Sequence, residues 1–393
     1  MPLWHVITAL GITQIVGWGT TYYALGALSL DIAAERHWSK FLIFGAFSAA
    51  LLISGLVSRA AGRAIDAHGG RRMMAAGSGL AGLGCLILSF AADPWIYVLG
   101  WLVLGPAMRL ILYDAAFPAL AQVARDKSRR SISYLTLFGG LASTVFWPVS
   151  HLLSQEIGWR GTFLVYALLH LVLCLPLHLL VLSRGPEPAD PSGREAPPAP
   201  AAPLLSGADR NHAMIAFTAV LALNGIVFSA ISAHVVPLFE GLGFTGAAAV
   251  TLAALIGPSQ VASRIGDILA GHWVKTMTLG LIAVGLLPAA LAIFALGGFA
   301  LWAALVFALL YGMSNGLMSI IKGIIPLSLF GQQGYGLVIG TLTAPQLILN
   351  AVAPTLFALV LDLAGPRGGL LVAIVFALAS FAAMLFLARR YPR

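Results

Sequence analysis

The clearest charged side chains inside the long apolar stretches of this sequence are these four: Arg109, Asp114, Arg264 and Lys322. A charge near the middle of an apolar layer costs about 2.5–3.5 kcal/mol or more, so such residues mark binding, pairing or proton transfer by default. Three of the four are cations, and a cavity biased in this way favours an anionic ligand. We therefore expect these residues to contribute to a site for a small organic anion.

Asp114 and Lys322 occupy matching places, because each lies four residues before a proline, Pro118 or Pro326. One hypothesis is that they form a gating pair. Another is that Lys322 binds the anion while Asp114 carries a proton. The alternative is a permanent ion pair that only neutralises two buried charges.

The two arginines have open roles. On a continuous helix, five residues separate Arg109 from Asp114 by about 140°, so these two should not pair directly. Arg109 is expected to face either a cavity or the first apolar stretch. Arg264 either binds substrate or reaches the membrane interface, with Asp267 placed to neutralise it on the same helix face.

Uncharged candidates cluster in the first apolar stretch, where aromatic rings and hydroxyls suit a cavity wall for a small polar ligand without a metal. They are Gln14, Trp18, Thr20, Tyr22 and Tyr23, followed later in the chain by Asn224, His234 and Asn315. Aromatic packing between helices is the alternative for the rings. The histidines within apolar stretches are interpreted as helix-to-helix hydrogen bonders; they are His151, His170 and His178.

The elements that must position these residues are membrane-spanning helices. Hydrophobic residues make up 60% of the 393 residues and charged residues only 9%, whereas soluble domains carry roughly a quarter charged residues. The apolar stretches are each near or above the ~20 residues that span a bilayer, and lipid leaves helices as the solution for such stretches. The stretches are residues 6–30, 41–61, 73–92, 95–123, 134–157, 162–182, 213–239, 247–270, 277–296, 299–326, 337–361 and 370–387.

Charge and proline content divide and orient the chain. Residues 184–212 are rich in proline, serine, glycine and charge, which is typical of a solvated linker between two groups of six stretches. Most of the 22 Lys and Arg residues fall on the side of the linker and of both termini. The exceptions in the opposite loops are Arg36, Lys40, Arg160 and Arg367. Positive loops stay inside, so we expect an inner-membrane protein with both termini cytoplasmic.

The loop after the second stretch carries Gly62, Asp66, Gly69, Arg71 and Arg72. Glycines allow close helix approach and a tight reversal, an aspartate can cap a neighbouring helix end, and the arginines hold the loop inside. This G-x-x-x-D-x-x-G pattern with following arginines resembles the loop signature of the major facilitator superfamily. The turn Gly158-Trp159-Arg160-Gly161 also resembles that superfamily.

The resemblance covers the whole chain and implies an all-α fold of twelve helices. It implies two six-helix bundles with pseudo-twofold symmetry, residues 1–183 and 213–393, joined by the linker. Helices one, four, seven and ten would line a central cavity, and rocking of the bundles would give alternating access. The Asp66 loop would then be a conformational latch.

Within the superfamily, the eighth apolar stretch gives information about the substrate. Arg264 resembles an arginine of the monocarboxylate-porter branch that is taken to bind the substrate carboxylate. Gln260 stands where that branch has aspartate, and the first stretch lacks the lysine of its animal members. We therefore expect a bacterial relative that transports a monocarboxylate-like anion, with a proton as the expected coupling ion but by a scheme other than that branch's.

Several other function classes are disfavoured. The basic residues form no single patch with aromatics, against nucleic-acid binding, and no phosphate-binding glycine loop appears, against ATP-driven transport. No nucleophile or metal motif supports an enzyme, and no cofactor is expected. One remaining alternative is a drug or metabolite efflux antiporter, because Gly139-Gly140 and Trp147-Pro148 loosely resemble the antiporter signature of the fifth helix. The other is a non-transporting membrane sensor. A monomer is the expected state.

Overall fold

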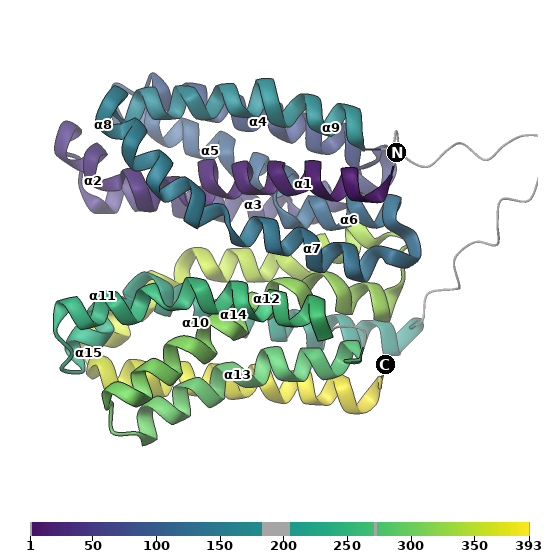
Figure 1. The fold of residues 1–393 in the computed structure, drawn as a ribbon, viewed down its shortest axis with the longest axis vertical. Helices are drawn as coiled ribbons and strands as arrows, with labels where there is room; N and C mark the ends of the chain where they lie inside the picture. Colours follow the sequence, from purple (N-terminus) through teal and green to yellow (C-terminus); the bar gives the residue numbers. More distant parts are fainter. Residues whose placement is uncertain (1, 183–204, 271–272, 393) are drawn as a thin grey trace, which may run out of the picture. The chain divides into compact units, whose positions relative to one another are not determined.

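The computed structural model describes residues 2–182, 205–270 and 273–392, and every regular element among them is helical (Figure 1). The all-α expectation is confirmed. By their contacts the residues form two units, Met1–Ala202 with Gly331–Ala344, and Pro203–Phe330 with Pro345–Arg393. Residues 183–204, which make up most of the expected linker, lie outside the described residues.

The described part of the first unit contains nine α-helices, α1 to α9, with short π and 3-10 segments between some of them. Their bounds are α1 Leu3–Gly17, η1 Trp18–Tyr22, α2 Ala24–Arg36, α3 Lys40–His68, α4 Gly70–Ser89, α5 Pro94–Ile111, α6 Tyr113–Ala124, η2 Arg125–Lys127, α7 Ser128–Gly140, α8 Ala142–Leu168, η3 Leu169–Cys174 and α9 Leu175–Val181. The first turns of α15 also belong to this unit by their contacts.

The second unit contains the remaining helices, α10 to α15. Their bounds are α10 Gly207–Gly241, α11 Gly246–Ala254, α12 Ile256–Ala270, α13 Thr276–Leu296, α14 Leu301–Phe330 and α15 Tyr335–Arg390. A core of buried aromatic rings holds α10, α13 and α14 together, with Phe239, Phe294 and Phe307 among them.

Eight helical stretches of the described residues are long and apolar enough to cross a membrane. This number agrees with twelve predicted spans because some stretches run through more than one of them. Pro94–Val181 covers the fourth, fifth and sixth, and Tyr335–Arg390 covers the last two. The first predicted span is not among the eight; its helix α1 ends at Gly17 and is followed by a π-helix, Trp18–Tyr22.

Two of the turns between long helices have the same backbone conformation. Gly158 has φ 71° and Gly365 has φ 68°, a left-handed conformation that suits glycine, and each reverses the chain between two long helices. Each glycine opens a G-x-R-G sequence, containing Arg160 or Arg367. Arg160 donates to the Ala91 carbonyl at 2.9 Å, whereas Arg367 lies over a phenylalanine ring at 5.5 Å. The repeat predicted from the sequence therefore extends to these turns.

Candidate functional site

The fourth predicted span is broken at Leu112, which has the extended values φ −81° and ψ −171° between α5 and α6. The break removes the helical partner of the Ile111 carbonyl. Gln14 of α1 replaces that partner, with its Nε2 donating to the Ile111 oxygen at 2.7 Å. In the second unit the corresponding span, α14, is continuous. Breaks of this kind place helix ends at binding sites inside membrane proteins.

The first span is also irregular beside this break. Residues Trp18–Tyr22 form a π-helix, an element found frequently at functional sites. A Cβ atom on Gly17 would lie 3.3 Å from the Leu112 side chain, so the π-helix begins against the break. The irregular parts of the first and fourth spans therefore meet.

Aromatic rings gather where these two irregular segments meet. The Trp18 ring lies 5.2 Å from Tyr22, 6.1 Å from Tyr23 and 5.2 Å from Tyr113, centroid to centroid. Trp18, Tyr22 and Tyr23 are half-buried, so their rings keep an accessible side. We call Trp18, Tyr22, Tyr23 and Tyr113 the aromatic cluster.

Arg109 lies in the last turn of α5, one turn before the break, and is 1% exposed. Its Nε donates to the Ser58 hydroxyl of α3 at 2.7 Å, and that hydroxyl lies 3.2 Å from the hydroxyl of Thr343 in α15. Its two terminal nitrogens have no hydrogen-bond partner among the described residues. Buried donors without partners are costly, and each of these two nitrogens can still donate to an acceptor placed beside it.

The break changes the predicted relation of Arg109 to Asp114. The 140° separation assumed one continuous helix, and that assumption is wrong because Leu112 lies between two helices. Asp114 is 7% exposed in the first turn of α6, where the helix dipole stabilises a carboxylate. Lys322 is half-buried in α14 of the second unit, so the proposed partnership with Asp114 stays a prediction.

The second unit has its own buried polar groups. Arg264 of α12 is 5% exposed and donates to the Ser319 hydroxyl of α14 through Nε at 3.4 Å and a terminal nitrogen at 3.2 Å. It points into the protein and does not reach the surface. Asn224 of α10 is fully buried, with no hydrogen-bond partner for either amide atom among the described residues. Asn315 is half-buried in α14.

The predicted latch aspartate caps a helix. Asp66 accepts hydrogen bonds from the Gly336 amide at 2.8 Å and the Leu337 amide at 2.7 Å, both in the first turn of α15. These amides have no partner within their own helix, and the helix dipole favours a negative charge at this end. The charge therefore ties the end of α3 to the start of α15.

Glycines make this contact possible. A Cβ atom on Gly62 would collide with the Gly336 carbonyl, and one on Gly340 would collide with the Ser58 carbonyl. Gly69, with φ 82°, then reverses the chain into α4, as the sequence predicted. Arg71 is half-buried and Arg72 is exposed after that turn.

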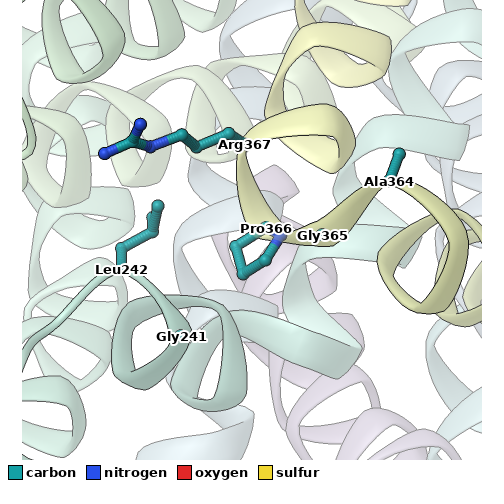
Figure 2. A pocket seen from close by; sticks show the side chains of 6 residues that line it. All are labelled: Gly241, Leu242, Ala364, Gly365, Pro366 and Arg367. Atoms are coloured by element: carbon teal, nitrogen blue, oxygen red, sulfur yellow. The ribbon is translucent and has the colours of Figure 1, made fainter.

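Two hollows lie in the second unit, and of the residues predicted for the substrate and gating sites only His234 lines either one. The first, of about 350 Å³, lies between the end of α10 and the Gly365 turn (Figure 2). Figure 2 shows Leu242 and Pro366 on its two sides, with the Arg367 side chain extending away from Pro366. The second, of about 290 Å³, is lined by His234 and Asp362 among others. The described residues contain no group of three metal-ligating side chains.

The Thr20 hydroxyl, predicted to line the cavity, donates to the Val16 carbonyl and lies 2.7 Å from His170 Nε2. Its role in a cavity stays a prediction. Sequence reasoning missed Ser58 as the partner of Arg109. The small residues Ser54, Ser58 and Gly62, spaced by four, are the signal that could have predicted a close helix contact there.

Comparison with known proteins identifies the fold. Residues 10–342 match the sequence model of the Major Facilitator Superfamily. The chain belongs to this superfamily. No curated protein sequence matches the chain significantly. The superfamily fold implies twelve membrane-spanning helices in two bundles, and it makes this chain a multi-pass membrane transporter of small molecules.

Solved structures of superfamily members agree with this membership. The chain is similar to the human organic anion transporter MFSD10 (TETRAN), with TM-score 0.74 and 15% identity over 98% of this chain and 100% of that one. It is similar to the superfamily transporter FucP in its outward conformation, with TM-score 0.72 and 13% identity over 97% and 98% of the two chains. A variant of the E. coli fucose:proton symporter FucP gives TM-score 0.70 at 13% identity, covering 98% of each chain.

Proposed function

We propose that this superfamily member moves a small organic anion with one carboxylate and an apolar body, by alternating access coupled to protons. The observation that carries the proposal is Arg109, a buried guanidinium with two terminal nitrogens that lack partners among the described residues. A guanidinium presents its donors as a planar fork that matches a carboxylate in two parallel hydrogen bonds.

The aromatic cluster supplies the second half of the proposed site. It lies at the helix break that follows Arg109, so a carboxylate on Arg109 would leave the rest of the ligand near the rings of Trp18 and Tyr113. Apolar walls with few polar groups are typical of small-molecule sites. A ring or short alkyl chain would be held by contact with these faces.

Ligand binding, measured by thermal stability, distinguishes the proposed anion transporter from a drug-efflux antiporter. Benzoate and acetate should raise the thermal stability of the purified transporter, benzoate more strongly because of its ring. Saturation near 100 times Kd stabilises by about 2.7 kcal/mol, which corresponds to a shift of roughly 2 °C or more. Stabilisation by tetraphenylphosphonium and by neither carboxylate would overturn the proposal in favour of a drug exporter.

Proton coupling is proposed to use Asp114, with Lys322 of α14 as its functional counterpart. Asp114→Asn and Lys322→Ala should each lower anion transport into proteoliposomes at least about tenfold, because each removes a buried charge that the cycle uses. Asp126→Asn changes an exposed carboxylate of η2 and serves as the control. Near-normal transport by both variants would leave the charges with a structural role only.

The proposed orientation places the transporter in the inner membrane as a monomer, with both termini in the cytoplasm. The distribution of Lys and Arg between the loops supports it. Peptide tags at the N-terminus and at the C-terminus should both resist a protease added to the outside of spheroplasts, whose inner membrane is intact and accessible. Digestion of either tag would reverse the orientation.

A further inference from the structure

We propose that His170 is a positioning residue: its hydrogen bond to Thr20 holds the first span in its π-helical register, and that register aims Trp18, Tyr22 and Tyr23 at the substrate. His170 belongs to a second π-helix, Leu169–Cys174, and is 1% exposed. The link therefore joins the irregular segments of the first and sixth spans. That the rings meet substrate rests on the proposed function, whereas the register itself does not.

Side-chain hydroxyls stabilise the π-helix from within. Its wider turn is visible in the Tyr23 amide, which donates to the Trp18 carbonyl five residues earlier at 2.9 Å. A change from α to π spacing leaves carbonyls without an amide partner. The Thr20 and Thr21 hydroxyls donate to the Val16 and Gly17 carbonyls at 2.7 and 2.6 Å and satisfy them.

The hydroxyl of Thr20 fixes the direction of its bond with His170. A hydroxyl has one hydrogen, and that of Thr20 is used on Val16. The imidazole must then donate its Nε2 hydrogen to Thr20, a tautomer assigned from this network. Nδ1 has no hydrogen-bond partner among the described residues. The bond to Thr20 is thus the single hydrogen bond shown for this ring.

His178 provides a matched comparison on the same span. Its Nδ1 lies 2.9 Å from the Ser78 hydroxyl and its Nε2 lies 3.0 Å from the Thr13 hydroxyl, so both ring nitrogens are satisfied. Thr13 lies in the regular part of α1. His178 therefore joins three helices without touching the π-helix, and both histidines are the helix-to-helix hydrogen bonders that the sequence predicted.

Loss of the hydrogen bond between His170 and Thr20 would allow the first span to shift its helical register. Converting a π turn to an α turn changes the helix by one residue, which rotates the later residues of the span by about 100°. On its other sides the segment packs with Gly19 against the Phe146 ring and Gly17 against Leu112. A rotation of Tyr22 and Tyr23 relative to Trp18 would disperse the aromatic cluster without removing any of its residues.

The test compares His170→Leu, which removes the donor, with His170→Gln, whose Nε2 can still donate. Benzoate transport by His170→Leu should show KM raised at least about tenfold with kcat within about twofold, and His170→Gln should restore KM to within about threefold. A general folding defect would not produce this split or this rescue. His178→Leu, the control, should leave KM within about twofold.

Hydrogen exchange of the purified full-length chain measures the register without substrate. Amides of residues 18–24 should exchange at a different rate in His170→Leu, and those in His178→Leu should change instead around Thr13. Unchanged exchange at 18–24 together with unchanged KM would overturn the role of His170. If the wild type binds no carboxylate, the proposed function fails while the exchange comparison still decides the register.

Discussion

Replacing Arg109 with glutamine is expected to weaken binding of benzoate by roughly 100-fold. The two terminal nitrogens that have no partner among the described residues would lose both charge and fork geometry. Hydrogen bonds to charged groups contribute about 1.5–3 kcal/mol each, and two at the lower value amount to about a hundredfold in affinity. The change should appear as a loss of the thermal stabilisation that benzoate gives the wild type.

The same variant should be at least as stable as the wild type without ligand. Removing a buried, incompletely bonded cation relieves a desolvation penalty, and residues kept for function often reduce stability. Arg109→Lys keeps the charge but not the fork, so it should bind benzoate less well than wild type. Arg59→Gln alters an exposed arginine next to Ser58 and should have no effect. Wild-type affinity in Arg109→Gln would exclude this residue from the site.

Asp66→Asn is expected to loosen the contact between α3 and the start of α15. The aspartate accepts two amide hydrogen bonds at a helix N-terminus, and asparagine offers one acceptor atom and no charge. Losing one charge-assisted bond and the dipole interaction should cost about 2 kcal/mol. A cysteine at Val338, which is 2% exposed in α15, should then react with a hydrophilic maleimide at least about tenfold faster.

The background for that measurement has Cys85 and Cys174 replaced by alanine, although both are buried. Asp126→Asn is again the control, since Asp126 is an exposed carboxylate in the neighbouring loop. A labelling rate at Val338 that does not change in Asp66→Asn would show that the glycine contacts and the Ser58–Thr343 hydrogen bond hold the two helices together without the aspartate.

Sequence reasoning predicted the parts of this transporter that depend on short-range patterns. Apolar length gives spans because lipid cannot satisfy backbone groups. The loop with Asp66 was expected to cap a neighbouring helix, and its aspartate bonds the start of α15. The sequence pattern did not say which helix it would be, because Gly336 lies 270 residues away in the chain.

The irregular segments could not be predicted in the same way. Pro118 and Pro326 lie at matching places, but Pro326 lies in a continuous helix whereas the fourth span is broken at Leu112. The two spans differ because the fourth span has a hydrogen-bond partner on another helix. Gln14 of α1 donates to the Ile111 carbonyl, which the break leaves without a helical amide. A break in apolar surroundings persists only where such a partner is present.

By itself the sequence determined that this chain is a bundle of apolar helices with a signature loop, and it supplied the residues from which a site can be built. Those properties follow from composition and from spacings of a few residues, which act locally. Only the tertiary structure decided that Arg109 bonds Ser58 and keeps two nitrogens unpartnered among the described residues, and that Thr20 bonds His170. These outcomes depend on hydrogen bonds between helices far apart in the chain, which no local pattern encodes.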